Sequence, residues 1–236
     1  MTSANPFSVN NPLVRRVTVD GEPLVEKTIR RNAPVPASYA ELKAEMDAYR
    51  DQLAAAGVPM PRIADSRVTD DSIVYLCEDG GRNLVERYEE PEALTNGHAD
   101  VLASAMRILK RAIDAGVAID PHIKNFVGDG ADLAYVDFSP PLTEAYVEAR
   151  CSVAQDEEQA ILRENFAYFT PYFLPYHFAG DFLNIDRAAE RLFPALHALL
   201  TDAGLLSGTP LAEFVSQAKA IRALEDRRLQ ERIYLI

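Results

Sequence analysis

The stretch that most constrains the fold covers residues 116–141, where the pattern indicates a polar loop, a tight turn and a short apolar strand that ends on a carboxylate. Residues 133–136 are strand-forming, and a Gly-Asp-Gly turn precedes them. A hairpin of this kind would carry Asp137 back beside Asn125, which itself follows Asp120 by five positions. Carboxylate and amide oxygens that face one point suit Mg²⁺, which prefers one or two carboxylates together with substrate phosphates. The stretch therefore predicts a binding place for Mg²⁺ and a phosphorylated compound.

The pattern D-x-x-x-x-N, followed by an apolar strand and Asp-Phe, resembles the catalytic loop and metal-binding segment of the protein-kinase-like fold. Residues 120–125, DPHIKN, look most like the small-molecule branch, which includes aminoglycoside phosphotransferases and choline-kinase-like enzymes. That branch often has His two positions after the catalytic Asp, as His122 is here. Ala118 stands where the family usually has His, and Ser139 stands where Gly usually follows Asp-Phe. The alternative interpretation is a surface loop with ordinary turn residues, because short matches of this kind occur by chance.

Composition narrows the class of protein. The 236 residues suffice for one large domain or two small lobes, and a hydrophobic content of 48% supports a packed core. The net charge of −12 argues against nucleic acid or an anionic membrane surface as the main partner. Cys77 and Cys151 form no spacing pattern, so free thiols in a reducing compartment are expected. Neither an apolar run of about 18 residues nor a signal-peptide pattern is found, which favours a cytoplasmic location.

A hairpin is predicted near the N-terminus. Residues 13–19 and 24–29 are strand-forming, and the turn between them contains Asp-Gly. The family resemblance implies that Lys27, on the return strand, holds the α- and β-phosphates of a nucleotide. It also implies that residues 8–11, which lack glycine, cover those phosphates. The alternative for Lys27 is a solvated lysine on a strand.

A helix with a capping box is predicted next, from Ser38 and Glu41 in the pattern S-x-x-E. Gly57 ends it. One face of this helix should contain Leu42, Glu45, Tyr49 and Leu53. A glutamate within an apolar face needs a cation if it is buried, and the resemblance implies that Lys27 supplies it. The alternative is a glutamate at the edge of the helix, in water.

The remaining elements follow in order. Residues 62–68 and 72–77 are expected to be strands, and a Gly-Gly break after them marks the connection between two lobes. Helical patterns then cover residues 84–88, 99–115, 156–168, 185–203 and 211–233. The aromatic-rich residues 165–182 are interpreted as core packing, with an aromatic wall for a ring-bearing or cationic acceptor as the alternative. His98, His177 and His197 receive no functional role.

The order of these elements predicts an α+β, two-lobed protein-kinase-like fold. Residues 1–78 would form a nucleotide-binding lobe with a small antiparallel sheet and one helix. Residues 79–236 would form a mainly helical lobe with the catalytic loop and the acceptor site. The resemblance then implies a kinase that uses ATP and Mg²⁺ to phosphorylate a hydroxyl group of a small molecule.

The resemblance also implies roles for individual residues. Asp120 would position and deprotonate the acceptor hydroxyl, and His122 is the second catalytic candidate. Asn125 and Asp137 would hold Mg²⁺. The nucleotide phosphates would be bound by Lys27, oriented by Glu45.

Two other functions stay open. A non-catalytic kinase-like module could bind a nucleotide or a partner without turnover, and the missing glycines, Ala118 and Ser139 favour it. A protein kinase is less expected, because the sequence after Asp137 has no A-P-E segment. No zinc-type His/Cys spacing, G-x-S-x-G or G-x-G-x-x-G pattern supports a hydrolase or a dinucleotide-binding protein.

Overall fold

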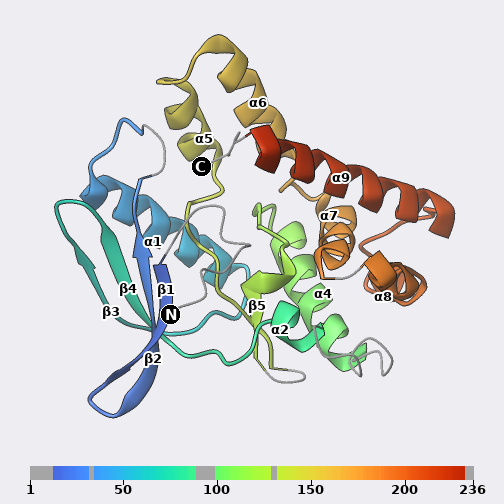
Figure 1. Ribbon diagram of the computed structural model, residues 1–236, viewed down its shortest axis with the longest axis horizontal. Helices are drawn as coiled ribbons and strands as arrows, with labels where there is room; N and C mark the ends of the chain where they lie inside the picture. Colours follow the sequence, from blue (N-terminus) through green and yellow to red (C-terminus); the bar gives the residue numbers. More distant parts are fainter. Residues whose placement is uncertain (1–12, 32–34, 89–98, 129–131, 186, 232–236) are drawn as a thin grey trace.

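The computed structural model describes residues 13–31, 35–88, 99–128, 132–185 and 187–231. The chain is α+β, with one four-stranded antiparallel sheet and a larger helical part beside it (Figure 1). The strand order is β1-β2-β4-β3. The strands are β1 (Leu13–Val19), β2 (Glu22–Ile29), β3 (Ile63–Val68) and β4 (Ile73–Glu78). The sheet confirms the predicted antiparallel strands.

The β1–β2 hairpin closes through a two-residue turn. Asp20 and Gly21 both have positive φ, 52° and 85°, as a type I′ turn requires. The register pairs Val19 with Glu22. Since β2 lies inside the sheet, its side chains near the end of the strand are buried, and Lys27 is one of them at 8% exposure.

Helix α1 (Tyr39–Ala55) has the predicted capping box. The Ser38 side chain accepts from the Glu41 amide, and the Glu41 carboxylate accepts from the Ser38 amide. Gly57, with φ of +77°, follows the end of the helix. The buried face consists of Leu42, Met46, Tyr49 and Leu53. The prediction that Glu45 lies in the middle of this face was wrong, because Met46 takes that place and Glu45 is half-buried at its edge.

The connection after β4 runs against a small second sheet. That sheet consists of β5 (Phe126–Val127) and β6 (Ala134–Tyr135), so the strand expected over residues 133–136 is shorter than predicted. A Cβ on Gly80 would lie 2.3 Å from a methyl carbon of Val127, so a side chain at position 80 would displace Val127. The Gly128 amide donates to the Arg82 carbonyl at 3.0 Å. The connection is therefore tied to the hairpin that precedes Asp137 and Phe138.

The rest of the chain is helical. Its α-helices are α2 (Leu84–Tyr88), α4 (Ala99–Asp114), α5 (Glu144–Cys151), α6 (Asp156–Ala167), α7 (Leu174–Asp181), α8 (Phe193–Asp202) and α9 (Leu211–Glu231). Short 3-10 helices are η1 (Ile123–Asn125), η2 (Phe182–Asn184) and η3 (Arg187–Leu192). The single helix predicted over residues 185–203 was wrong: η3 ends before α8, which begins a new helix with Pro194 in its first turn. Helix α5 was not predicted.

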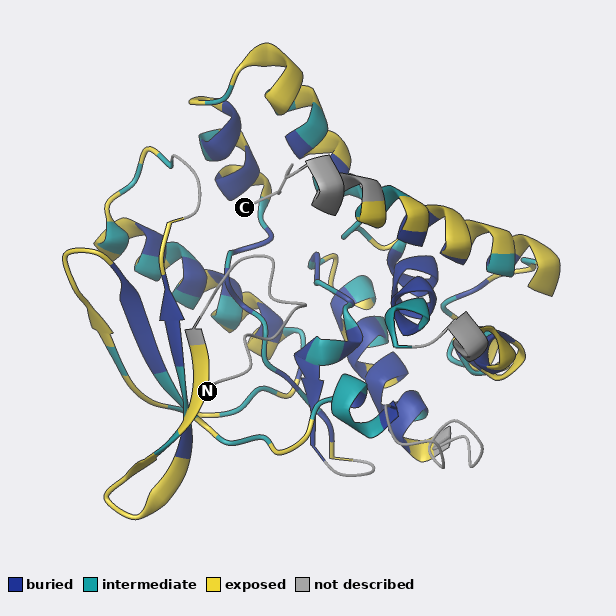
Figure 2. Cartoon of the chain, in the orientation of Figure 1, coloured by how far each residue is buried: buried dark blue, intermediate teal, exposed yellow. Residues whose placement is uncertain are grey.

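Burial follows the predicted hydrophobic pattern closely in the helical part. Helix α7 is buried along its whole length (Figure 2), which confirms core packing for residues 174–182 of the aromatic-rich segment, whereas residues 166–173 are only partly buried or exposed. Residues of the sheet, α1, α4 and α7 join one core cluster. Cys77 and Cys151 are free, as predicted. Among the described helices, none has the length and apolarity needed to cross a membrane. The lobe boundary at residues 78–79 stays a prediction.

Some sequence predictions lie outside the described residues. These are the phosphate-covering loop at residues 8–11, the tip of the Gly-Asp-Gly turn and His98.

Candidate functional site

Two of the predicted site residues form an ion pair across the molecule. Lys27 Nζ lies 2.9 Å from Asp137 Oδ1, although 110 positions separate the two residues. The side chains are 10% and 21% exposed. The ammonium group also lies 4.9 Å from the centroid of the Phe138 ring. Lys27 is therefore a buried, paired cation, and the alternative of a solvated strand lysine is wrong.

Asn125 lies beside this ion pair, as the hairpin pattern predicted. Its Nδ2 is 3.5 Å from Asp137 Oδ2 and 3.4 Å from the carbonyl oxygen of Asp120. The Val136 amide donates to the Asn125 carbonyl at 3.0 Å, which holds the two segments together. Asn125 is 5% exposed. A half-turn of the amide exchanges its nitrogen and oxygen, so one carboxylate and one amide oxygen can face the same point.

This pair of donors fits Mg²⁺ by its chemistry. Both are hard oxygen ligands, and Mg²⁺ uses one or two such protein ligands while water and phosphate oxygens complete its coordination. The neighbouring Lys27 is in reach of the same carboxylate, so a phosphate group near the metal would meet a second cation. Asn125 and Asp137 are therefore the candidate metal ligands.

The expected ion pair between Lys27 and Glu45 is absent from the described part of the chain. Lys27 is instead paired with Asp137, while Glu45 Oε2 is buried with no hydrogen-bond partner. Burial, and secondly the negative charge of Glu41, raise the pKa of Glu45 above its ordinary value. The physical reason is that α1 turns Met46 toward the core, which leaves the Glu45 carboxylate at the edge.

Backbone and tyrosine contacts hold the Asp120 loop, defined as residues 116–125. The Asp120 amide donates to the Tyr135 hydroxyl at 3.1 Å. The Tyr49 hydroxyl donates to the Ala118 carbonyl at 2.7 Å. Both tyrosines are fully buried, so α1 and β6 fix the loop from two sides. The Ala118 side chain, at the position where the resemblance has His, packs in the core.

Asp120 and His122 form a tight pair within this loop. Asp120 Oδ1 accepts from the His122 amide at 3.0 Å and also contacts His122 Nδ1. Burial alone would lower the pKa of His122, but the charges of Asp120 and Glu225 raise it well above its ordinary value. Burial would raise the pKa of Asp120, yet the positive charge of His122 brings it below its ordinary value. Asp120 and His122 thus each favour the charged form of the other.

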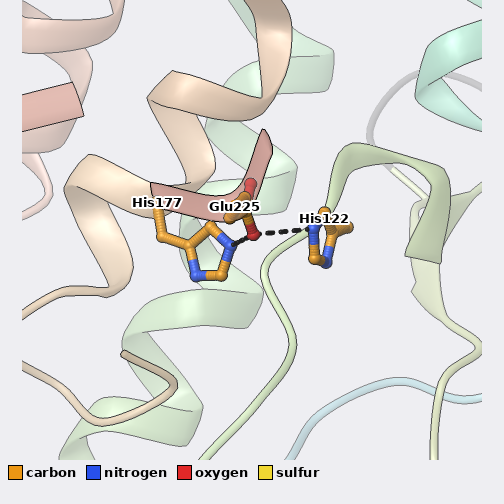
Figure 3. A group of neighbouring side chains, drawn as sticks. All are labelled: His122, His177 and Glu225. Atoms are coloured by element: carbon orange, nitrogen blue, oxygen red, sulfur yellow. Dashed lines mark hydrogen bonds and ion pairs between the residues drawn. The ribbon is translucent and has the colours of Figure 1, made fainter. Parts of the chain in front are cut away.

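Helices α7 and α9 supply residues that the sequence analysis did not assign to the site. Asp181 accepts from the Ile123 amide at 2.7 Å with its Oδ2. His177, which is 1% exposed, and Glu225 lie next to His122 (Figure 3). His177 lies within an aromatic run that indicated core packing, and Glu225 lies on a charged helix. Neither has a spacing signal, because each reaches the loop only through tertiary packing.

Comparison with known proteins adds no family assignment. The chain matches no protein-family model, and a search of curated proteins found no significant match. The resemblance to the kinase-like fold therefore remains a hypothesis that depends on the residues and contacts described above. The function has to be argued from the chemistry of the site.

Proposed function

We propose that the chain is an ATP- and Mg²⁺-dependent phosphotransferase that acts on a hydroxyl group of a small molecule. The observation that carries this proposal is the convergence of Lys27, Asn125 and Asp137, with the Asn125 amide also against the backbone carbonyl of Asp120. A phosphate-binding cation, a pair of oxygen ligands and a carboxylate for the acceptor are the parts that phosphoryl transfer needs. Such catalysis consists mostly of positioning and electrostatic stabilisation, so the relative positions of these groups are what supports the proposal.

Asn125 and Asp137 would hold Mg²⁺, which would offset negative charge on the phosphate oxygens of ATP. Lys27 would bind the phosphates as a point charge. Asp137, the present partner of Lys27, would then share its negative charge between Lys27 and the metal. The resemblance implies that Glu45 pairs with Lys27. Because Glu45 Oε2 has no hydrogen-bond partner here, the Glu45 carboxylate could pair with the Lys27 ammonium when a nucleotide is bound.

Asp120 would accept a hydrogen bond from the acceptor hydroxyl and take its proton. The contacts of His122 described above reach Oδ1, so Oδ2 would be the oxygen that meets the acceptor. His122, as a donor at both ring nitrogens, would hold the Asp120 carboxylate in one orientation. The small-molecule acceptor would therefore lie on the side of Asp120 away from His122.

A non-catalytic nucleotide-binding module is the second candidate. The observation that favours it is the ion pair of Asp120 with His122, which lowers the basicity of the carboxylate. Ser139 also favours this candidate, since the resemblance has glycine at that position. This candidate retains ATP binding and lacks turnover.

The metal ligand is tested first, by calorimetric titration of the chain with ATP in the presence and absence of Mg²⁺. Asp137→Asn should abolish Mg²⁺-dependent ATP binding, because the amide lacks the negative charge that holds the metal. Asp132→Asn, an exposed aspartate of the same hairpin, is the matched control and should bind as the parent does. Unchanged metal dependence in Asp137→Asn would remove Asp137 from the site.

Asp120→Asn separates the enzyme from the binding module. In the enzyme, acceptor-dependent release of ADP should fall by roughly 10²- to 10⁴-fold, as for other general bases, while ATP affinity hardly changes. The measurement is ADP release over a panel of hydroxyl compounds, together with ATP affinity. Turnover that is unaffected in the variant would contradict the role of Asp120. A parent that binds ATP and turns over no acceptor would support the non-catalytic module.

A further inference from the structure

Three side chains from distant parts of the chain point toward one another between the Asp120 loop, α7 and α9 (Figure 3). His122 Nε2 lies 3.1 Å from Glu225 Oε1, and His177 Nε2 contacts the same oxygen. The donor atoms of all three residues lie within 4.8 Å of one another. The two imidazole rings meet edge to face, with centroids 4.9 Å apart. Two imidazole nitrogens and one carboxylate oxygen thus converge on one point.

The far side of each imidazole is also held. His122 Nδ1 contacts the carboxylate of Asp120, and His177 Nδ1 donates to the carbonyl oxygen of Tyr168 at 3.3 Å. A histidine that binds a metal through Nε2 usually has its Nδ1 bonded to a carboxylate or a backbone carbonyl, because this contact fixes the ring orientation. Both histidines have such a partner, and both turn their Nε2 toward Glu225.

The carboxylate of Glu225 is oriented in the same way. Its Oε2 accepts from an Arg222 guanidinium nitrogen at 2.9 Å, so Oε1 is the oxygen that faces the histidines. Arg222 is 9% exposed and is itself held by Asp226 at 3.1 Å. Asp181 Oδ1 lies 3.7 Å from the same guanidinium. The position of Glu225 is therefore built by buried and paired groups, and is not that of a free surface glutamate.

We propose that His122, His177 and Glu225 bind one Zn²⁺ ion, at a site distinct from the Asn125 and Asp137 pair. Two imidazoles and one carboxylate are a ligand set of catalytic zinc sites, which leave the fourth position to water or a ligand. Tetrahedral bonds of about 2.0–2.2 Å put ligand atoms about 3.3–3.6 Å apart, so the donor atoms, which lie within 4.8 Å of one another, would adjust to that spacing when the ion binds. Mg²⁺ would not compete, because it prefers oxygen ligands.

Access and charge are consistent with this ion. The side chains of His122 and Glu225 are 22% and 14% exposed, so solvent reaches the cluster from their side, whereas His177 is 2% exposed. In the ion-free protein a proton on His122 would offset the negative charges of Asp120 and Glu225. A bound Zn²⁺ would replace that proton and join α7 and α9 to the loop that carries Asp120. The proposal does not depend on phosphoryl transfer.

The first test uses the unmodified chain after removal of metal with a chelator. Zn²⁺ is titrated in competition with a chromophoric chelator, with Mg²⁺ in excess and without ATP. One ion per chain with a Kd below about 1 μM is expected. In the same protein, the ¹⁵N resonances of the ring nitrogens should shift on addition of Zn²⁺ for two of the four histidines. A parent chain that binds no stoichiometric ion, or shifts of none or other histidines, would overturn the proposal.

The second test assigns the ligands. His177→Ala and Glu225→Gln should weaken Zn²⁺ binding by about 100-fold or more, since each removes one of three protein ligands. The matched controls are His197→Ala, whose ring contacts the Thr209 carbonyl, and Glu213→Gln, an exposed glutamate of α9; both should bind as the parent does. Folded ligand variants that bind Zn²⁺ like the parent would refute the site. Because no nucleotide is present, that failure is distinct from failure of ATP binding at Asp137.

Discussion

The buried ion pair between Lys27 and Asp137 makes a quantitative prediction about stability. At 2.9 Å the gross attraction is about 6 kcal/mol for an effective dielectric constant of about 20. Desolvation of the two ions costs several kcal/mol each and offsets most of this attraction. Removing one partner is different, because the other charge then stays buried without compensation.

The two single substitutions should therefore cost unequal amounts. Asp137→Asn leaves the ammonium of Lys27, which is 10% exposed, without its counter-charge and should cost about 3 kcal/mol. Lys27→Met leaves a carboxylate that is 21% exposed and can be reached by water, so about 2 kcal/mol is expected. The double variant loses both charges and should cost about 2–3 kcal/mol, which gives a coupling energy of about 2–3 kcal/mol.

The assay is urea unfolding in the presence of a chelator, followed by circular dichroism and by tyrosine fluorescence, since the chain has 10 Tyr and no Trp. Coincident transitions from the two probes justify a two-state analysis. The control cycle is the exposed pair of Lys110 and Asp114 on α4, which should couple by only about 0.3–0.5 kcal/mol. If the costs of Lys27→Met and Asp137→Asn add in the double variant within about 0.5 kcal/mol, the reasoning about the buried charge is refuted.

Three further predictions concern single positions. Ser38→Ala removes the capping box of α1 and should lower the free energy of unfolding by about 1 kcal/mol in urea; a loss near zero would mean that the cap is replaced by water. Gly180→Ala should cost about 1–3 kcal/mol, because its Cβ would lie 2.6 Å from the backbone oxygen of Ala218, and a substitution at residue 218 should not restore stability. Glu45→Gln should be more stable than the parent at neutral pH. The pKa of Glu45 is raised by folding, so the parent loses stability as pH rises above about 4.3 through the folded pKa, and the advantage of the variant should vanish toward pH 4 in unfolding curves. An advantage that is constant with pH would show that Glu45 is not desolvated.

Local signals explain why much of the fold was predictable from the sequence. The Asp20-Gly21 turn permits the positive φ values that close the first hairpin, and the Ser38 cap satisfies amides at the start of α1. The short hairpin after Asn125 brings Asp137 back to it, because only one connection of a few residues is involved. These features depend on residues close in sequence, so their physics is readable without a structure.

Some misses were also local. Pro194 marks a new helix start within residues 185–203, and its fixed φ is a boundary signal that the helical periodicity outweighed. Helix α5 is a similar case, with Thr143 accepting from the Tyr146 amide as a side-chain cap. The start of α8 and the start of α5 could both have been predicted, from the proline and from the capping threonine.

The partners of charged side chains were decided only by tertiary packing. The sequence predicted that Lys27 lies on the return strand of the first hairpin and that Glu45 lies on the following helix, and the resemblance implied that these two residues form a pair. The structure selects Asp137, because Met46 takes the buried place on α1 and the hairpin brings Asp137 to 2.9 Å. Likewise, no spacing relates His122 to His177 and Glu225, which meet because α7 and α9 pack behind the Asp120 loop. A charge interaction depends on distance and burial, and for residues far apart in the chain both quantities exist only after the core has formed.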